Sequence, residues 1–193
     1  MSPAHCRHCK TDIAPMECYC PSCGVLQPLP PVDYFTLLGI ETQYTLEMQA
    51  LEHAYLALQK QFHPDRFVNR KPEEKILAAQ YAAEINAAYE TLKHPRKRAE
   101  YILKQEGISL GDSREAVKPS QELLLETLEL REQLQEVAAP SLPGLLKAAD
   151  NLREETISAI TAAYRDKDYP VMAQAVLRLG YLDKYREEIA RKK

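Results

Sequence analysis

Tryptophan is absent from this chain of 193 residues, which also contains only 3 phenylalanines and 6 glycines. Any hydrophobic core must therefore rely on leucine, alanine, isoleucine and tyrosine. The sequence has no run of eighteen apolar residues, so we expect no membrane-spanning helix. Its start, MSPAHCRHCK, has neither the apolar core of a signal peptide nor an Arg/Ser-rich amphipathic pattern. We therefore expect a cytoplasmic (bacterial) protein, or a protein of the mitochondrial matrix if a transit sequence has been removed.

An excess of basic residues is also missing, since 25 Lys and Arg face 28 Asp and Glu, a net charge of -3. Nucleic-acid binding usually needs clustered basic residues, so we expect no nucleic-acid partner. Evidence for an enzyme is missing too, because none of the five histidines has an obvious nucleophile partner. These histidines are His5, His8, His53, His63 and His94.

Cysteine is confined to the first 23 residues, which argues against a fold held together by disulfides. Residues 1–30 form a polar segment that ends at the stiff sequence QPLPP. From Asp33 onward, apolar residues recur at helical spacing, with proline or aspartate at several helix starts. The predicted helices span roughly 46–62, 73–92, 95–105, 119–137, 142–166 and 168–191. No strand pattern occurs outside the cysteine segment, so the fold class is all-α.

Four cysteines form a C-x2-C-x10-C-x2-C array, namely Cys6, Cys9, Cys20 and Cys23. Two residues between thiolates let a tight turn direct both sulfurs at one ion, and four thiolates satisfy tetrahedral Zn²⁺. Gly24, after the second pair, tolerates the positive φ of such a turn better than Lys10 does after the first. A segment this short buries little apolar surface, so metal binding would supply most of its folding free energy, roughly 10 kcal/mol or more.

We therefore predict a structural Zn²⁺ held by these four thiolates. Two disulfides, or a cysteine cluster without a function, are the alternatives. Cys18 is predicted to be spare, and His5 or His8 could replace a thiolate only at a geometric cost.

The sequence LQKQFHPDRFVNR interrupts the helical pattern at His63-Pro64-Asp65. Proline and aspartate are common in turns, so this tripeptide could be merely a loop between two helices. Its position between helices of suitable length for antiparallel packing favours a functional motif. Lys60 precedes it and Arg66 follows it.

The helix predicted from residue 119 has more leucines than one buried face requires. At 100° per residue, one stripe faces a core, and three further leucines point to nearly the opposite side beside glutamates. The stripe comprises Leu123, Thr127, Leu130, Leu134 and Val137, and the second face comprises Leu124, Leu125, Leu128, Glu129, Glu132 and Glu136. This second face is predicted to bind a partner; a fully buried helix or scattered surface leucines are the alternatives.

Three stretches resemble a J-domain: DYFTLLGI (33–40), LQKQFHPDRF and EINAAYETLKHPRKRAEYIL (84–103). The resemblance implies that His63, Pro64 and Asp65 dock on the ATPase domain of an HscA/DnaK-type chaperone and stimulate ATP hydrolysis. Lys60 and Arg66 are then candidates for further chaperone contacts. Basic residues are fewer here than is usual on the helix before the motif, which predicts weak electrostatic steering.

LLLETLELREQL and LRLGYLDKYREEI (177–189) resemble the C-terminal domain of the HscB family, the J-domain co-chaperones of iron–sulfur cluster assembly. This resemblance implies that the second face of the leucine-rich helix and Tyr181 bind a cluster scaffold protein of the IscU type. Composition and periodicity divide the chain into the cysteine segment at 1–30, a helical region at 31–107, a Gly-containing linker at 108–117 and three helices at 118–193; the resemblances identify these as a zinc module, a J-domain and a scaffold-binding three-helix bundle.

Two functions other than that of an adaptor between chaperone and scaffold are the alternatives. A general J-protein that delivers unfolded clients would need a Gly/Phe-rich region or a β-rich domain, and residues 108–193 show neither. A zinc-ribbon factor for nucleic acid would need a basic face, whereas Arg7 and Lys10 in residues 1–30 are balanced by Asp12 and Glu17.

Overall fold

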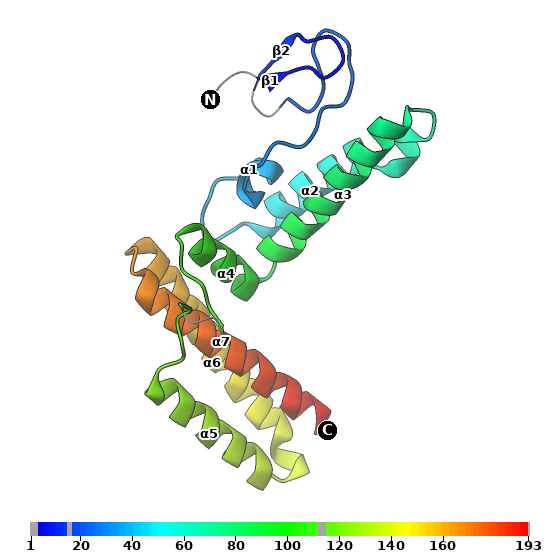
Figure 1. Ribbon diagram of the computed structural model, residues 1–193. Coiled ribbons are helices and arrows are strands. Elements are labelled where there is room, and N and C mark those ends of the chain that lie inside the picture. Colours follow the sequence, from blue (N-terminus) through cyan, green and yellow to red (C-terminus); the bar gives the residue numbers. More distant parts are fainter. Residues whose placement is uncertain (1–3, 15–16, 112–114, 193) are drawn as a thin grey trace. The chain divides into compact units, whose positions relative to one another are not determined.

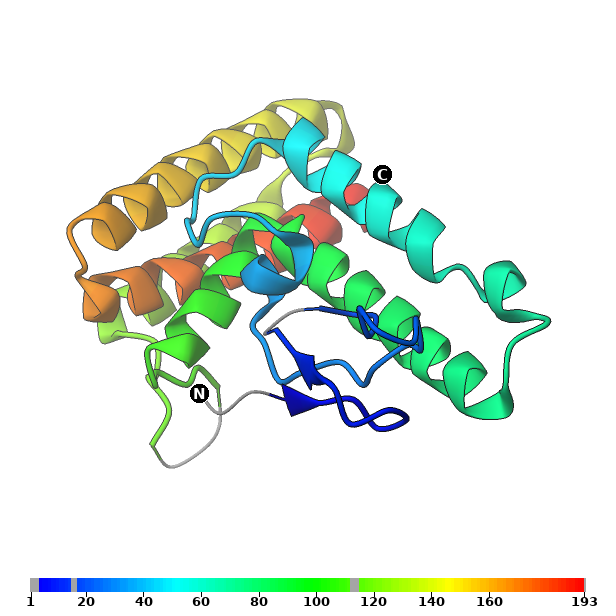
Figure 2. The same ribbon diagram turned by 90° about the horizontal axis from the view of Figure 1, so that it is seen from above.

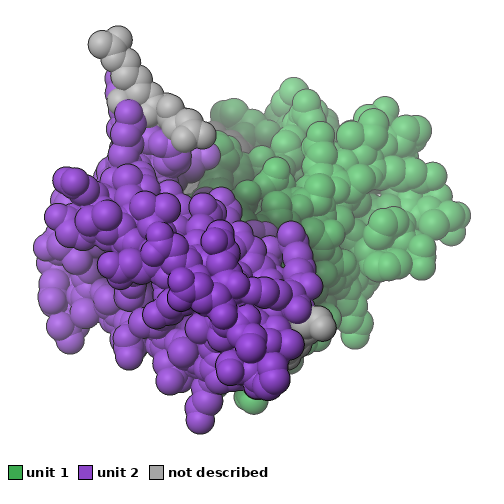
Figure 3. Space-filling model, turned by 90° about the horizontal axis from the view of Figure 1, so that it is seen from below, with its two compact units in different colours: residues 1–93 green, residues 94–193 purple. Residues whose placement is uncertain are grey.

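The computed structural model describes residues 4–14, 17–111 and 115–192. The chain forms two compact units, residues 1–93 and 94–193 (Figure 3). Seven α-helices make up most of the described residues, and two short strands lie in the N-terminal segment (Figure 1). This confirms the predicted all-α class. None of the helices in the described ranges has the length and hydropathy that a membrane-spanning segment requires.

The N-terminal module is built around sulfur more than around hydrocarbon. Strand β1 (Ala4–His5) pairs antiparallel with β2 (Asp12–Ile13), and a single bridge joins Tyr19 to Leu26. The small core of the module consists of Cys6, Cys20 and Ile13, with Cys23 packed against it. So small an apolar core cannot stabilise a fold alone, which agrees with the prediction that a metal does so.

Helix α1 (Tyr34–Leu38) is the first helix of the first unit. It is not among the helices that sequence periodicity predicts. It is short because both ends are capped. The Asp33 carboxylate accepts hydrogen bonds from the amides of Phe35 (2.9 Å) and Thr36 (3.0 Å). Gly39 ends the helix in the left-handed region at φ 66°.

Helices α2 (Met48–Phe62) and α3 (Pro72–Leu92) lie side by side as a helical hairpin (Figure 1). The 3-10 helix η1 (Pro64–Phe67) lies in the loop between them. The predicted ranges 46–62 and 73–92 are therefore correct to within two residues. The buried face of α3 repeats every three or four residues, as predicted, and includes Tyr81, Ile85, Ala88 and Leu92.

An aromatic stack that the sequence does not reveal joins the N-terminal module to this hairpin. The ring of Tyr19 lies 6.4 Å from that of Phe62, the last residue of α2, with an interplanar angle of 3°. Phe62 in turn stacks on Tyr81 of α3, with ring centroids 4.2 Å apart. Burial and the neighbouring Cys18 raise the pKa of Tyr81. The module therefore packs near the end of α2 that carries the H-P-D motif.

The second unit contains four helices and a 3-10 turn. Helices α6 and α7 form a long hairpin (Figures 1 and 2), and α4 and α5 each pack against α7. The elements are α4 (Pro95–Gln105), α5 (Gln121–Glu136), η2 (Ala139–Ser141), α6 (Leu142–Arg165) and α7 (Tyr169–Arg191). Asp168 caps α7 as predicted, accepting a hydrogen bond of 3.1 Å from the amide of Val171.

A partly buried arginine ties together the three helices of the bundle. Arg178 of α7 forms a bidentate ion pair with Glu126 of α5 and donates a hydrogen bond of 2.9 Å to the Thr156 hydroxyl of α6. Arg153 of α6 pairs with Asp183 of α7 at 2.7 Å. Hydrogen-bonded pairs with low exposure fix geometry better than surface pairs do, so the Arg178–Glu126 pair helps to set how α5 lies on the hairpin, while Arg153–Asp183 ties α6 to α7.

Helix α4 belongs to the second unit, although the sequence assigns it to the J-domain within residues 31–107. It packs against α7, and its Arg96 reaches Asp183 at 3.4 Å. The segment 108–117, predicted as a linker, has contacts of its own, because the Val117 amide donates to the Ser109 carbonyl at 2.9 Å.

Candidate functional site

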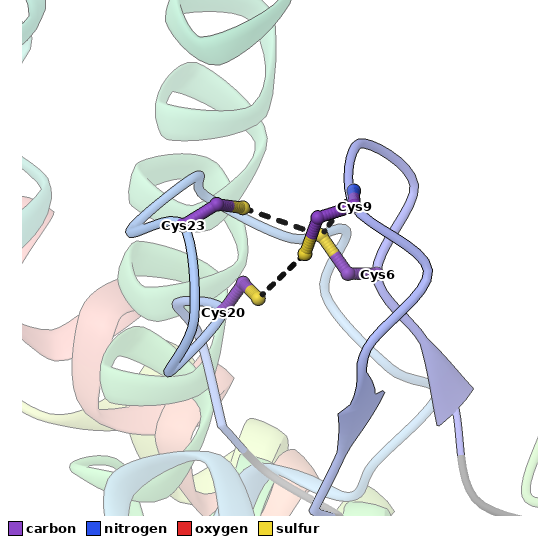
Figure 4. A group of neighbouring side chains, drawn as sticks. All are labelled: Cys6, Cys9, Cys20 and Cys23. Carbon is purple, nitrogen blue, oxygen red and sulfur yellow. Dashed lines mark hydrogen bonds between the residues drawn. The ribbon is translucent and has the colours of Figure 1, made fainter.

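The four cysteines of the paired C-x-x-C array converge on one point (Figure 4). Cys6 Sγ lies 3.6 Å from Cys23 Sγ, Cys9 Sγ lies 3.5 Å from Cys20 Sγ, and all four sulfurs lie within 4.8 Å of one another. Sulfurs held at ~2.3 Å by one tetrahedral ion would lie about 3.8 Å apart. A disulfide would instead need about 2.05 Å. The described cysteines are all free thiols, so the geometry fits a metal site and not the disulfide alternative.

Matching turns present the two pairs. The Lys10 amide donates to the Cys6 carbonyl at 3.0 Å, and the Gly24 amide donates to the Cys20 carbonyl at 2.9 Å. Both turn residues have positive φ, 65° at Lys10 and 68° at Gly24. The role expected for Gly24 is thus confirmed, and Lys10 adopts the same conformation despite its side chain.

The electrostatics of the cluster also favour a bound cation. The Thr11 hydroxyl lowers the pKa of Cys9 to about 6, and the Cys9 amide is the main cause of a lowered pKa at Cys6. Although the Val25 amide favours the thiolate, burial and the three neighbouring sulfurs raise the pKa of Cys23 to about 12. Four thiolates so close together repel one another, and a divalent cation removes that cost.

Two neighbours that could have competed for the ion lie elsewhere. Cys18 is half-buried beside Tyr81 and is not one of the four clustered thiols. His5 pairs with Asp12, with Nδ1 2.6 Å from the carboxylate, and also lies outside the cluster.

The H-P-D motif forms the start of the loop after α2. Its His63 and Asp65 side chains are 54% and 86% exposed. The Asp65 amide donates to His63 Nδ1 at 3.3 Å, and Pro64 begins η1. Phe62 before the motif and Phe67 after it are both buried. Two hydrophobic anchors thus hold the loop while its polar side chains face solvent.

A shallow hollow lies beside this motif, at the C-terminal end of α2. It is lined by Leu56, Gln59, Lys60, His63 and Arg66. Arg66 donates to the Lys60 carbonyl at 3.4 Å, so both predicted basic residues lie next to the motif. Arg70 and Lys71, which the sequence did not single out, are also exposed in the same loop.

Helix α5 turns three leucines toward solvent. Leu124 is 44% exposed, Leu125 54% and Leu128 55%, whereas Leu123 and Leu134 on the opposite stripe are buried. We call the first three the leucine triad. The glutamates beside them are also exposed, and we call them the acidic rim: Glu129, Glu132 and Glu136. The alternative of a fully buried helix is therefore wrong.

Tyr181 does not lie among the leucine triad but on α7, half-buried, across a small hollow from α5. This hollow is lined on the α5 side by Thr127, Leu130 and Arg131. Arg131 follows Leu128 by three residues and Leu124 by seven, so these three side chains share one flank of α5. Arg131 therefore lies between the leucine triad and Tyr181 on this side of the bundle.

Two family models match the chain. The DnaJ domain matches residues 33–101, and the HSCB C-terminal oligomerisation domain matches residues 119–190. The crystal structure of human co-chaperone protein HscB has a TM-score of 0.90 and 26% identity, with 98% of each chain covered. Chaperone HscB from Vibrio cholerae has a TM-score of 0.75 and 30% identity, covering 83% of this chain and 97% of that one. The chain belongs to the HscB family of J-domain co-chaperones.

The Jac1 co-chaperone from Saccharomyces cerevisiae shares the fold of this HscB-family chain. Its TM-score is 0.64 at 20% identity, over 82% of this chain and 97% of that one. HscB proteins are co-chaperones of iron–sulfur cluster assembly, and their partners in general are chaperones of the seventy-kilodalton type and cluster scaffolds. The match to human HscB spans nearly the whole chain and so extends into the cysteine module.

Proposed function

We propose that this HscB-family chain stimulates the ATPase of an HscA/DnaK-type chaperone through its H-P-D loop while its C-terminal bundle holds an IscU-type scaffold. One observation carries the proposal. A J-domain with an exposed H-P-D motif and an HscB-type bundle with an exposed leucine triad occur in a single chain. The chain then acts as an adaptor, and every catalytic group belongs to the chaperone.

The H-P-D loop is suited to docking because its backbone is restrained and its His63 and Asp65 side chains, which lie 3.5 Å apart, are exposed to solvent. Pro64 fixes its own φ, and the buried rings of Phe62 and Phe67 hold both ends of the motif. The Asp65 carboxylate can then accept charge-assisted hydrogen bonds from an arginine of the chaperone. Lys60, Arg66 and Arg70 favour an acidic surface around that arginine.

The leucine triad is suited to a scaffold whose surface is apolar at its centre and basic at its edge. Burying one leucine contributes roughly 1–2 kcal/mol of binding free energy when the contact is well packed. The acidic rim on the same helix would pair with basic groups of the scaffold, and this contribution falls as salt rises. Tyr181 supplies an aromatic contact at the α7 edge of this surface.

The cysteine module is proposed to hold Zn²⁺ through Cys6, Cys9, Cys20 and Cys23. When bound, the ion would neutralise the thiolates and link the two turns into one fold. Four protein ligands leave no open coordination position, so the site is structural and not catalytic.

The test of the chaperone function is single-turnover ATP hydrolysis by the chaperone with and without this protein. We expect His63→Gln and Asp65→Asn to abolish stimulation, because the chaperone is proposed to contact these exposed side chains directly. Helical circular dichroism should stay unchanged, since neither side chain is part of the core. Glu84→Gln is the matched control, because Glu84 is an exposed acid on α3 away from the motif. Full stimulation by Asp65→Asn would remove the J-domain activity from the proposal.

A further inference from the structure

A groove runs between α4 and α7 with residues 108–111 along its edge, and we call it the α4–α7 groove. Its volume is about 440 Å³. Apolar groups contribute to it from both sides, from Ile108 and Leu110 on one side and from Val176 and Leu177 of α7 on the other. Gly180 of α7 also lines the groove, and a Cβ there would come into van der Waals contact with the Arg96 side chain.

The charged residues of the groove are not equivalent. Arg96 is held by Glu100 at 3.0 Å and by Asp183 at 3.4 Å, so its charge is already neutralised. Lys104 and Lys184 also line the groove, both are exposed, and neither has an ion pair among the described residues. Two uncommitted ammonium groups beside an apolar floor suit a ligand that carries acidic and apolar groups together.

The α4–α7 groove is continuous with the surface proposed to bind the scaffold. Tyr181 lines the groove on one side and the small hollow against α5 on the other. Lys184 lines both as well, and Arg131 closes the hollow on the flank shared with Leu124 and Leu128. Shared residues thus connect the groove, through Tyr181 and Lys184, to the hollow against α5, which Glu188 also lines.

We propose that the α4–α7 groove binds an acidic segment, bearing an apolar side chain, of the same scaffold protein that the leucine triad binds. This inference rests on the proposed function. The combined surface is negative at the acidic rim and positive at Lys104 and Lys184. A scaffold with the complementary order of charges binds in one orientation, because the reverse orientation places like charges together.

The test is a calorimetric titration of the full-length protein with purified, cluster-free IscU-type scaffold. The variant is the double charge reversal Lys104→Glu with Lys184→Glu, and the matched control is Lys97→Glu with Lys147→Glu, which changes the net charge equally. All four lysines are exposed, so folding should be unaffected. We expect the groove variant to lose at least tenfold in affinity and the control less than threefold. Scaffold binding should also protect residues 104–111 and 177–184 from hydrogen exchange.

Three outcomes would overturn the inference. If the groove variant binds within threefold of the control while Leu→Ala replacement of the leucine triad still abolishes binding, the groove is not part of the scaffold interface. If the wild-type protein itself does not bind the scaffold, the proposed function fails as well. If sedimentation shows that the groove variant disrupts self-association and leaves scaffold affinity unchanged, the occupant is a second copy of this chain.

Discussion

At the scale of single residues, two cysteines with one residue between them have different surroundings. The sulfur of Cys20 lies 3.5 Å from that of Cys9 in the four-cysteine cluster. Cys18 lies beside Tyr81 of α3 instead. Tyr19 between them stacks on Phe62, so this short stretch contacts both the four-cysteine cluster and the α2–α3 hairpin.

This difference predicts opposite effects of two serine substitutions on metal content. Cys18→Ser should retain about one equivalent of Zn²⁺ per chain, whereas Cys20→Ser should release it, because three thiolates and a hydroxyl form a much weaker site. Metal analysis of protein purified under reducing conditions measures both. Wild-type protein without metal, or Cys20→Ser protein that keeps it, would contradict the structural zinc site.

The clustering of the four cysteines could be predicted from the sequence because their paired spacing suits two tight turns that direct the sulfurs to one point. Lys10 shows what spacing leaves open. The turn holds Lys10 at φ 65°, which costs roughly 1–2 kcal/mol of conformational free energy for a residue other than glycine. No sequence pattern shows that the other contacts of the turn offset this cost. The low pKa of Cys9 likewise depends on the Thr11 hydroxyl, whose orientation appears only in the fold.

At the scale of elements, α5 is the clearest case of a helix whose two faces have different tasks. Its buried stripe docks on α6 and α7, aided by the Glu126–Arg178 pair, while the leucine triad remains at the surface. Helical periodicity predicts these two faces correctly, because α5 is long enough for residues three and four apart to repeat on the same face over several turns. The same periodicity missed α1, whose five residues are too few to show a pattern and whose ends depend on Asp33 and Gly39.

Replacing all three residues of the leucine triad by alanine should separate binding from folding. We expect at least a tenfold loss of scaffold affinity with little change in melting temperature, because Leu124, Leu125 and Leu128 are about half exposed. Raising salt should weaken the wild-type complex, since the acidic rim contributes. Calorimetric titration and thermal melts on the same samples measure both effects.

Leu134→Ala is the matched control for that experiment. Leu134 is on the same helix but only 8% exposed, so its truncation should lower the free energy of unfolding by about 2–3 kcal/mol and leave a folded molecule that still binds. A triple variant that melts as low as Leu134→Ala would show that the leucine triad belongs to the core. Unchanged scaffold binding by the triple variant would show that the scaffold does not bind the face of α5 that carries the leucine triad.

At the scale of the whole molecule, the sequence predicted which segments carry the chemistry but not how they are packed. The Tyr19–Phe62–Tyr81 stack joins residues far apart in the chain, and nothing in the local pattern around the half-buried Tyr19 or the buried Phe62 and Tyr81 pairs them. The grouping of α4 with α7 similarly depends on Arg96 and Asp183, which local patterns cannot pair. Such contacts follow from tertiary packing, which periodicity and motif spacing do not encode.

The proposed adaptor function makes a prediction about the whole chain, namely that its two surfaces must act in one molecule. A chaperone and a scaffold bound to the same chain meet at an effective concentration on the order of millimolar, which separate molecules at micromolar concentration cannot reach. Mixing full-length Asp65→Asn protein with the triple leucine variant should therefore fail to restore scaffold-dependent ATPase stimulation. Each variant keeps one functional surface, so stimulation in the mixture should equal the scaffold-independent level of the leucine variant alone. Single-turnover hydrolysis with chaperone and scaffold at micromolar concentration measures this directly. Recovery of wild-type stimulation in the mixture would mean that the two surfaces act independently or that the chains associate.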